Sequence, residues 1–541
     1  MTMLSVKVDV YPGVPTANLE RQSGNFICKF RQKFRYCFSI SRKSLCSQAI
    51  EKSQWQSVVG LEVHAQIKSN SKLFSGASTK FSSPVNTGVA LFDCSIPGTL
   101  PVLNKRCVEA GVLTALALGC RVNPVSYFDR KHYFYADLPM GYQITQQRAP
   151  LAVQGELKFQ VYTPAIHKKP YQAKVKIQQI QLEQDSAKSL HDTDRSLVDL
   201  NRAGVPLMEL VFDPDLKDGE EAAALVKELV LILQKLNTCS CKMEEGALRV
   251  DANVSIHKEG EPLGVRTEIK NIGSIRGVAS AVESEIKRQI QVRNALGTIT
   301  NETRAWDPIN KTTVAMRDKE VVQDYRFMPE PNLPPLHIAM GPVEIGCVNA
   351  DKLRETIPEL PEQTRAKLRD EGLTLEQSII LVNDVSLLAI YKDAVGERNV
   401  NKKVMANFLI NDLNTLLNKN DMVSEGIKCP RHYFSEIVEL LEKGSITRST
   451  AKLLLEDVVL NNSGAPEKIV REKNWLQITD EEELRKLCEQ VIKENERIVK
   501  QYHAGKSKVF KALLGAIAKE SKNRAEMSKC TVILKALLNK K

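Results

Sequence analysis

Residues 61–67 alternate strictly between apolar and polar side chains, and this period of two constrains the fold more than any other feature of the chain. Successive side chains of an extended strand point to opposite faces. One face here carries Leu61, Val63, Ala65 and Ile67, and the other carries Glu62, His64 and Gln66. A carboxylate, an imidazole and an amide in a row predict a chemical use for the second face.

Two later segments alternate in the same way. The polar positions are Arg249, Asp251, Asn253 and Ser255 in residues 247–256, and Arg266, Glu268 and Lys270 in residues 265–270. If the three strands share a sheet, its polar face collects acids, bases and one histidine, which suits a metal ion and phosphate groups. We therefore expect nucleotide contacts from Arg249, Asp251, Arg266 and Glu268.

Composition sets outer limits on the kind of protein. A chain of 541 residues should hold about three or four domains. No apolar run reaches the roughly 18 residues of a membrane-spanning helix. The net charge of +11 permits a polyanionic partner. The 12 cysteines include no Cys-x2-Cys pair, which argues against a zinc site or disulfide framework and favours reduced thiols inside a cell.

The N-terminal segment, residues 1–52, differs from the rest. From residue 24 to residue 50 it is basic, contains serines and aromatics, and has no acidic residue. That composition is typical of a mitochondrial transit segment, although Asp9 and Glu20 fit it less well. We predict import into the mitochondrial matrix; a disordered basic tail is the alternative.

Periodicity predicts an α+β protein. Strand-like alternation dominates from residue 55 to residue 345, with helices expected at 108–119, 220–236 and 274–296, the last capped by Ser274. From residue 357 onward the pattern is almost entirely helical. The predicted organisation is a mixed or antiparallel-sheet domain at 53–350, an all-α helical domain at 351–480, and a helical tail at 481–541.

Acid-rich segments also occur at residues 128–137, 182–188, 199–209 and 242–246. Many carboxylates with few histidines favour Mg²⁺ or Mn²⁺ over Zn²⁺. The chain has no Walker loop, kinase signature, Rossmann glycine pattern or Gly-x-Ser-x-Gly elbow. A nucleotide would need a different cradle, and amide hydrolysis by this chain itself is disfavoured.

Several long motifs, in order, resemble the mitochondrial form of the B subunits of tRNA-dependent amidotransferases, the GatB/GatE family. They are GLEVHAQ at 60–66, PGTLPVLN at 97–104, FDRKHYFY at 128–135, DLNR at 199–202, KMEEG at 242–246, RVDANV at 249–254 and DYRFMPEP at 324–331. The resemblance implies a carbon–nitrogen ligase with glutamine as amido-nitrogen donor. It implies that the chain uses ATP and Mg²⁺ to phosphorylate Glu-tRNA(Gln), then passes it ammonia released by a GatA-type amidase subunit. A small GatC-type subunit would complete the heterotrimer.

The resemblance also implies roles for individual residues. The metal-holding positions of the family's cradle domain fall on Glu62, His64, Glu183 and Glu209. The lysine that lines the ammonia path falls on Lys131, and all five are expected to be catalytic. Two departures stand out: Gln184 replaces a channel acid of bacterial members, and a second channel lysine falls on Met140.

The tail resembles the family's YqeY-like domain, which grips tRNA. Its cations outnumber the acids Glu520 and Glu526. Lysines of this kind bind phosphates without reading sequence. The expected tRNA-binding residues are Lys506, Lys508, Lys511, Lys519 and Lys522.

Three other interpretations remain open. The chain could be a non-catalytic tRNA-binding scaffold whose acids are structural. It could be the archaeal Glu-specific paralogue, but residues 329–338 run into helices with no room for that protein's inserted domain. It could be an independent ligase that uses free ammonia. Dependence on a glutaminase partner would separate the last of these from the favoured interpretation.

Overall fold

The computed structural model describes residues 54–191, 194–316, 325–341, 346–398, 400–461 and 464–539. The predicted targeting segment at 1–52 therefore lies outside the described residues. The elements below belong to the larger of two compact units, Ser57–Ile256 with Leu263–Lys541, apart from residues at the outer ends of two strands.

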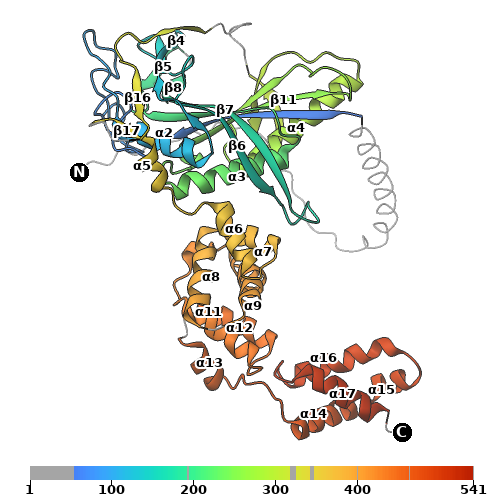
Figure 1. The fold of residues 1–541 in the computed structure, drawn as a ribbon. Helices are drawn as coiled ribbons and strands as arrows, with labels where there is room; N and C mark the ends of the chain where they lie inside the picture. The colour runs from blue at the N-terminus through green and yellow to red at the C-terminus, as the bar shows by residue number, and fades with distance from the viewer. Residues whose placement is uncertain are drawn as a thin grey trace, which may run out of the picture. The chain divides into compact units, whose positions relative to one another are not determined.

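A nine-stranded sheet forms the centre of the first region (Figure 1). Its order is β14-β13-β12-β11-β1-β10-β7-β6-β2. Most of its pairs are antiparallel, but β12 and β13 pair in parallel, so the sheet is mixed as predicted. Its strands are β1 (Gln56–Gln66), β2 (Arg121–Val122), β6 (Ala152–Val161), β7 (Tyr171–Gln184), β10 (Pro206–Phe212), β11 (Leu248–His257), β12 (Thr267–Lys270), β13 (Thr303–Asp307) and β14 (Thr312–Ala315).

Three small sheets accompany it. Their orders are β15-β4-β5, β17-β16-β3 and β8-β9. The strands are β3 (Val125–Ser126), β4 (Asp129–His132), β5 (Tyr142–Thr145), β8 (Lys188–His191), β9 (Ser196–Asp199), β15 (Arg326–Pro329), β16 (Leu336–Ala339) and β17 (Val348–Asn349).

The alternation predicted for β1 is confirmed. Leu61, Val63 and Ala65 are fully buried, whereas Glu62 and His64 are only partly buried. Burying this apolar face is the main hydrophobic gain of the strand. The three predicted helices also form, as α2 (Lys105–Ala117), α3 (Gly219–Lys235) and α4 (Ile275–Asn294), with ends shifted by up to three residues.

Helices α3 and α4 pack side by side (Figure 1). A Cβ atom at Gly219 would lie 2.2 Å from the carbonyl oxygen of Ala279, so glycine is needed at this close approach. The predicted cap of α4 is confirmed, because the Ser274 side chain accepts a hydrogen bond of 3.0 Å from the Gly277 amide.

The rest of the described chain is helical, which confirms the predicted fold class. Asp384 caps one of these helices and Asn401 caps another. The elements are α5 (Ala350–Glu355), α6 (Pro361–Asp370), α7 (Leu375–Val382), α8 (Val385–Glu397), α9 (Lys402–Asn407), a π-helix (Phe408–Leu413), α10 (Asn414–Lys419), α11 (His432–Glu442), α12 (Arg448–Leu460), α13 (Pro466–Glu472), α14 (Glu481–Glu494), α15 (Glu496–His503), α16 (Phe510–Glu520) and α17 (Met527–Leu538).

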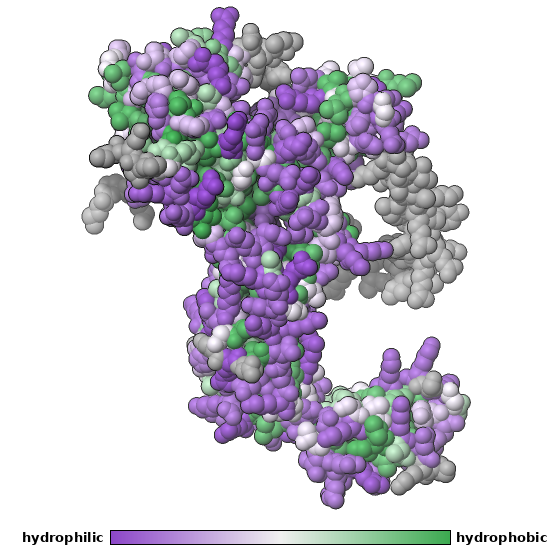
Figure 2. Space-filling model, in the orientation of Figure 1, coloured by the Kyte–Doolittle hydropathy of each residue, from purple (hydrophilic) through white to green (hydrophobic). Residues whose placement is uncertain are grey.

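Two separate hydrophobic clusters hold these helices. One contains residues of α6 to α13 and Leu231 of α3, and the other contains only residues from 484 to 538. The surface over the first cluster is largely hydrophilic in the view of Figure 2, as expected for helices that bury their apolar faces. None of the described helices is long and apolar enough to cross a membrane.

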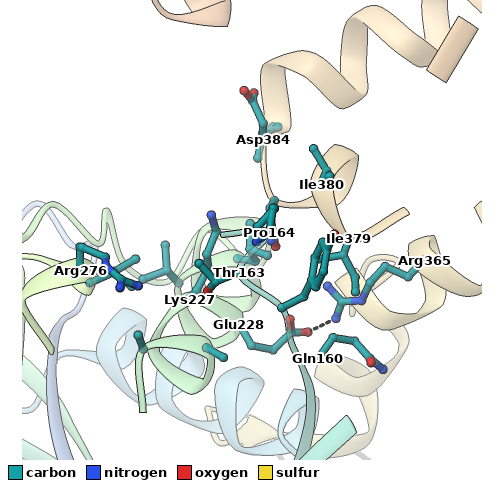
Figure 3. Close-up of a pocket in the computed structure, with 18 of the residues that line it drawn as sticks. Gln160, Thr163, Pro164, Lys227, Glu228, Arg276, Arg365, Ile379, Ile380 and Asp384 are labelled. Atoms are coloured by element: carbon teal, nitrogen blue, oxygen red, sulfur yellow. Dashed lines mark hydrogen bonds and ion pairs between the residues drawn. The ribbon is translucent and has the colours of Figure 1, made fainter. Parts of the chain in front are cut away.

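A cavity of about 860 Å³ lies between α3 and the helices that follow the sheet (Figure 3). Beside it, Arg365 of α6 donates to Glu228 of α3 at 2.6 Å (Figure 3). Arg365 is 1% exposed and Glu228 is 5% exposed. This buried ion pair therefore links the two regions, and each partner satisfies the charge of the other.

Replacing Arg365 by methionine should lower stability by about 3 kcal/mol, because Glu228 would remain buried without its partner. In thermal denaturation we expect the melting temperature to fall by about 10 °C. Adding Glu228→Gln should recover much of the loss. The matched control is Arg431→Met, whose ion pair with Asp393 is half exposed and should matter little. Equal losses in the two arginine variants would contradict the prediction.

Candidate metal and nucleotide site

The register of the central strands gathers polar side chains on one face of the sheet. His64 of β1 lies opposite Glu209 of β10, and Glu209 lies opposite Gln181 of β7. Directly paired residues project to the same face. Glu183 follows two positions after Gln181, so it also projects to this face. The antiparallel pairing thus assembles residues that are far apart in the sequence.

His64, Glu183 and Glu209 form a compact group. One potential ligand atom from each lies within 4.8 Å of the others. The His64 Nε2 atom is 3.8 Å from Glu209 Oε1. The Oε2 atom of Glu183 is buried and has no hydrogen-bond partner. Two carboxylates, one of which has an unbonded buried oxygen, and an imidazole fit a hard divalent cation such as Mg²⁺ or Mn²⁺. We call these three residues the ligand group.

Glu62, the fourth predicted metal ligand, is not a member of the ligand group. It lies two residues before His64 on β1, and its partner on β10 is Val211 rather than Glu209. Its Oε1 atom accepts a hydrogen bond of 3.0 Å from Asn253 Nδ2 of β11. Glu62 is still near enough to help raise the pKa of Glu209.

The electrostatics of the ligand group follow from its burial. Burial, and then the charge of Glu209, raise the pKa of Glu183 to about 7. Burial lowers the pKa of His64, which keeps its imidazole in the neutral form that binds metals. Burial opposes a charge on Lys131 of β4, but the attraction of Glu183 and Glu209 outweighs it and raises the pKa of Lys131. Lys131 is therefore a cation beside the ligand group.

These pKa shifts predict how pH acts on metal binding. A metal ligand must be deprotonated, so Mg²⁺ affinity should fall about tenfold per pH unit below pH 7, where Glu183 becomes protonated. Without the ion, the raised pKa means that the contribution of Glu183 to stability is greatest below pH 4.5 and is lost as the pH rises through 7, by about 3 kcal/mol. Thermal unfolding with and without Mg²⁺ across this range tests both trends. Both pH trends should disappear in the Glu183→Gln variant. If the wild-type protein showed neither trend, the prediction would be contradicted.

The predicted nucleotide-binding residues lie on β11 and β12 or just before β12. Arg249 donates to Asp185 at 2.6 Å. Lys270 binds Asp251 at 2.8 Å and Glu268 at 3.0 Å. Arg249 and Asp251 form their ion pairs on β11, next to β1, and Glu268 forms its pair on β12, the strand beyond β11. Arg266 precedes β12 and is exposed. Their side chains are thus gathered on adjacent strands, except for that of Arg266.

Sequence reasoning missed two side chains at the site. Gln143 of β5 donates to Glu183 Oε1 at 2.6 Å, and Gln181 of β7 donates to Glu209 Oε2 at 2.6 Å. The only signal for Gln181 was its place two residues before Glu183 in an alternating strand. Gln143 lies three residues after Met140, which the family resemblance had singled out, but no charge or periodicity marked Gln143 itself.

The two departures from the bacterial pattern occupy different settings. Gln184 is 1% exposed and its side-chain oxygen has no hydrogen-bond partner. Met140 is half-buried, in a turn before β5. The predicted tRNA-binding lysines lie in or beside α16, one of the helices that the second hydrophobic cluster holds together. All five are exposed: Lys506, Lys508, Lys511, Lys519 and Lys522.

Two family models match the chain. The one described as the GatB/GatE catalytic domain matches residues 57–344, which include the whole ligand group. The sheet region is thus a catalytic domain of the GatB/GatE class. A second model, described as the GatB domain, matches residues 390–538. The chain belongs to the GatB/GatE family of tRNA amidotransferase subunits.

Relatives of known name support the assignment. The chain is 54% identical to a protein of Aedes aegypti named as the mitochondrial B subunit of glutamyl-tRNA(Gln) amidotransferase, over 93% of this chain and 97% of that one. It is 48% identical to the human protein of the same name, over 90% and 88%. It is 39% identical to a Rickettsia canadensis protein named as the B subunit of aspartyl/glutamyl-tRNA(Asn/Gln) amidotransferase, over 90% and 98%.

Proposed function

We propose that this chain is the B subunit of a glutamyl-tRNA(Gln) amidotransferase and acts in the mitochondrial matrix. In this function it phosphorylates the side-chain carboxylate of Glu-tRNA(Gln) with ATP, and ammonia then displaces phosphate to give Gln-tRNA(Gln). The observation that carries the proposal is the ligand group within the matched catalytic domain. The names of four animal relatives support the mitochondrial location.

The chemistry explains why such a group is needed. A carboxylate resists ammonia until one oxygen becomes a good leaving group, and phosphorylation provides that. A bound Mg²⁺ would neutralise phosphate charge. His64, Glu183 and Glu209 would hold the ion, with Glu62 close by. Lys131 would add a positive charge where negative charge develops, and it remains the candidate for guiding ammonia.

Arg249, Asp251 and Glu268 are proposed to contact the nucleotide from the adjacent strands β11 and β12. Their ion pairs with Asp185 and Lys270 support this role, because paired charges hold fixed positions. Arg266 stays in the proposal as an exposed cation that would meet the outer part of the nucleotide.

The partners are proposed to be a GatA-type amidase subunit and a small GatC-type subunit. The loop between β1 and α2 supports a protein interface, since it exposes several large apolar side chains. They are Phe81, Val85, Leu91, Ile96, Leu100 and Val102. The five tail lysines are proposed to bind the tRNA backbone.

The two hydrophobic clusters support the proposed organisation of the chain. In it, residues 53–350 form the catalytic domain, 351–480 the helical domain and 481–541 the tRNA-binding tail. Residues 1–52 are proposed to direct import.

The deciding experiment is reconstitution with the GatA-type and GatC-type partners, Glu-tRNA(Gln), glutamine and ATP, followed by analysis of the aminoacyl product. We expect Gln-tRNA(Gln) only when ATP and all three proteins are present. Product formed without the amidase partner, from free ammonia alone at low concentration, would favour an independent ligase. Asp-tRNA(Asn) as a second substrate extends the test to the broader specificity named for the Rickettsia relatives.

A further inference from the structure

Each carboxylate of the ligand group is held by the amide of a buried glutamine. Gln143 Nε2 donates to Glu183 Oε1, and Gln181 Nε2 donates to Glu209 Oε2, both at 2.6 Å. Gln143 is 7% exposed and Gln181 is 3% exposed. The two donors come from different strands, β5 and β7, and neither carries a charge.

The second oxygen of each carboxylate is left for the site. Glu183 Oε2 is buried without a hydrogen-bond partner, and Glu209 Oε1 lies 3.8 Å from His64 Nε2. We propose that Gln143 and Gln181 are positioning residues, which fix one oxygen of each carboxylate so that the other points at the divalent ion. This inference rests on the metal site proposed above.

A neutral donor suits this task better than a cation. An arginine or lysine bonded at the same oxygens would orient the carboxylates but would also cancel the charge that attracts the ion. An amide orients them through a hydrogen bond and leaves that charge available. Such outer partners of metal ligands typically change metal affinity by 10- to 100-fold when they are removed.

The amides are themselves anchored. Gln143 Nε2 also donates to the Gln184 carbonyl oxygen at 2.7 Å, and Gln181 Nε2 also donates to Thr145 Oγ1 at 3.2 Å. Gln179 donates in turn to the side-chain oxygen of Gln181. Both donors are therefore fixed before any ion arrives, which is the condition for pre-organised ligands.

Titration of the assembled complex with Mn²⁺, followed by the electron paramagnetic resonance signal of the free ion, tests the proposal. Gln143→Met and Gln181→Met keep side-chain length but remove the donor. We expect each to raise the Kd for Mn²⁺ by about 10- to 100-fold. The matched control is Gln146→Met, because Gln146 is fully buried nearby but bonds Ser126 and the Leu182 amide rather than the ligand group. Its Kd should stay within about twofold of wild type.

Melting curves of the ion-free complexes separate this role from a purely structural one. If a methionine variant does not fold, Gln143→Asn and Gln181→Asn withdraw the same amide by one methylene and serve in its place. Folded variants that bind Mn²⁺ as tightly as wild type would overturn the positioning role while leaving the metal site intact. A wild-type complex that binds no Mn²⁺ would overturn both.

Discussion

Replacing Glu209 by glutamine is expected to reduce the formation of Gln-tRNA(Gln) by about 10³-fold, because several kcal/mol of charge stabilisation depend on the ion that the ligand group would hold. The glutamine keeps the size of the side chain but removes half of the carboxylate charge of the group. Hydrolysis of glutamine by the partner amidase should continue, since that chemistry does not use this site. The measurement is the rate of ATP-dependent transamidation beside the rate of glutamate release.

Glu156→Gln is the matched control, because Glu156 lies on the same sheet and forms ion pairs with two surface lysines, Lys158 and Lys174. It should leave both rates unchanged. The transamidation rate of Glu62→Gln should lie between the rates of Glu209→Gln and Glu156→Gln, since Glu62 lies beside the ligand group. Full transamidation in Glu209→Gln would establish the alternative function, a scaffold that binds tRNA and whose acids are structural.

Changing the five tail lysines to glutamine should weaken binding of Glu-tRNA(Gln) and flatten its dependence on salt. Each phosphate contact contributes about 0.7 to 0.9 to the slope of log K against log salt. Five contacts therefore predict a loss of roughly four in that slope, and about 10²-fold in affinity near physiological salt. The KM for Glu-tRNA(Gln) should rise while ATP turnover at the sheet survives. All five side chains are exposed, so the tail should stay folded.

An equal change of charge elsewhere provides the control. Five exposed lysines of the β6–β7 hairpin serve this purpose: Lys158, Lys168, Lys169, Lys174 and Lys176. Their replacement should leave the salt slope near the wild-type value. If both quintuple variants lose the same slope, binding depends on overall charge, and the tail has to be reassigned as a structural or subunit-contact region.

Local patterns predicted the elements well. Strand β1 was found because a half-buried strand must alternate, and helix α4 was found because Ser274 has the chemistry of a cap. The individual helix ends at Asp384 and Asn401 were not predicted, although both are good capping residues. Apolar positions continue on both sides of Asp384, and that continuity hid the first of the two caps.

The site was only partly predictable, because it depends on pairing between distant strands. Spacing in the sequence places Glu62 and His64 side by side, but the register with β10 decides that His64 meets Glu209 and that Glu62 meets Val211. Gln143 reaches Glu183 from a strand about forty residues earlier in the chain. No periodicity of a single segment contains that information. Arg266 was assigned to a strand that begins one residue later, at Thr267.

Strand β1 is the fifth of nine in its sheet, with four strands on either side. Sheets lose their hydrogen bonds first at their margins, where local opening costs little free energy. Opening at either margin would therefore stop several strands short of His64. The amides of β1 should therefore exchange their hydrogens with solvent only when the whole sheet opens.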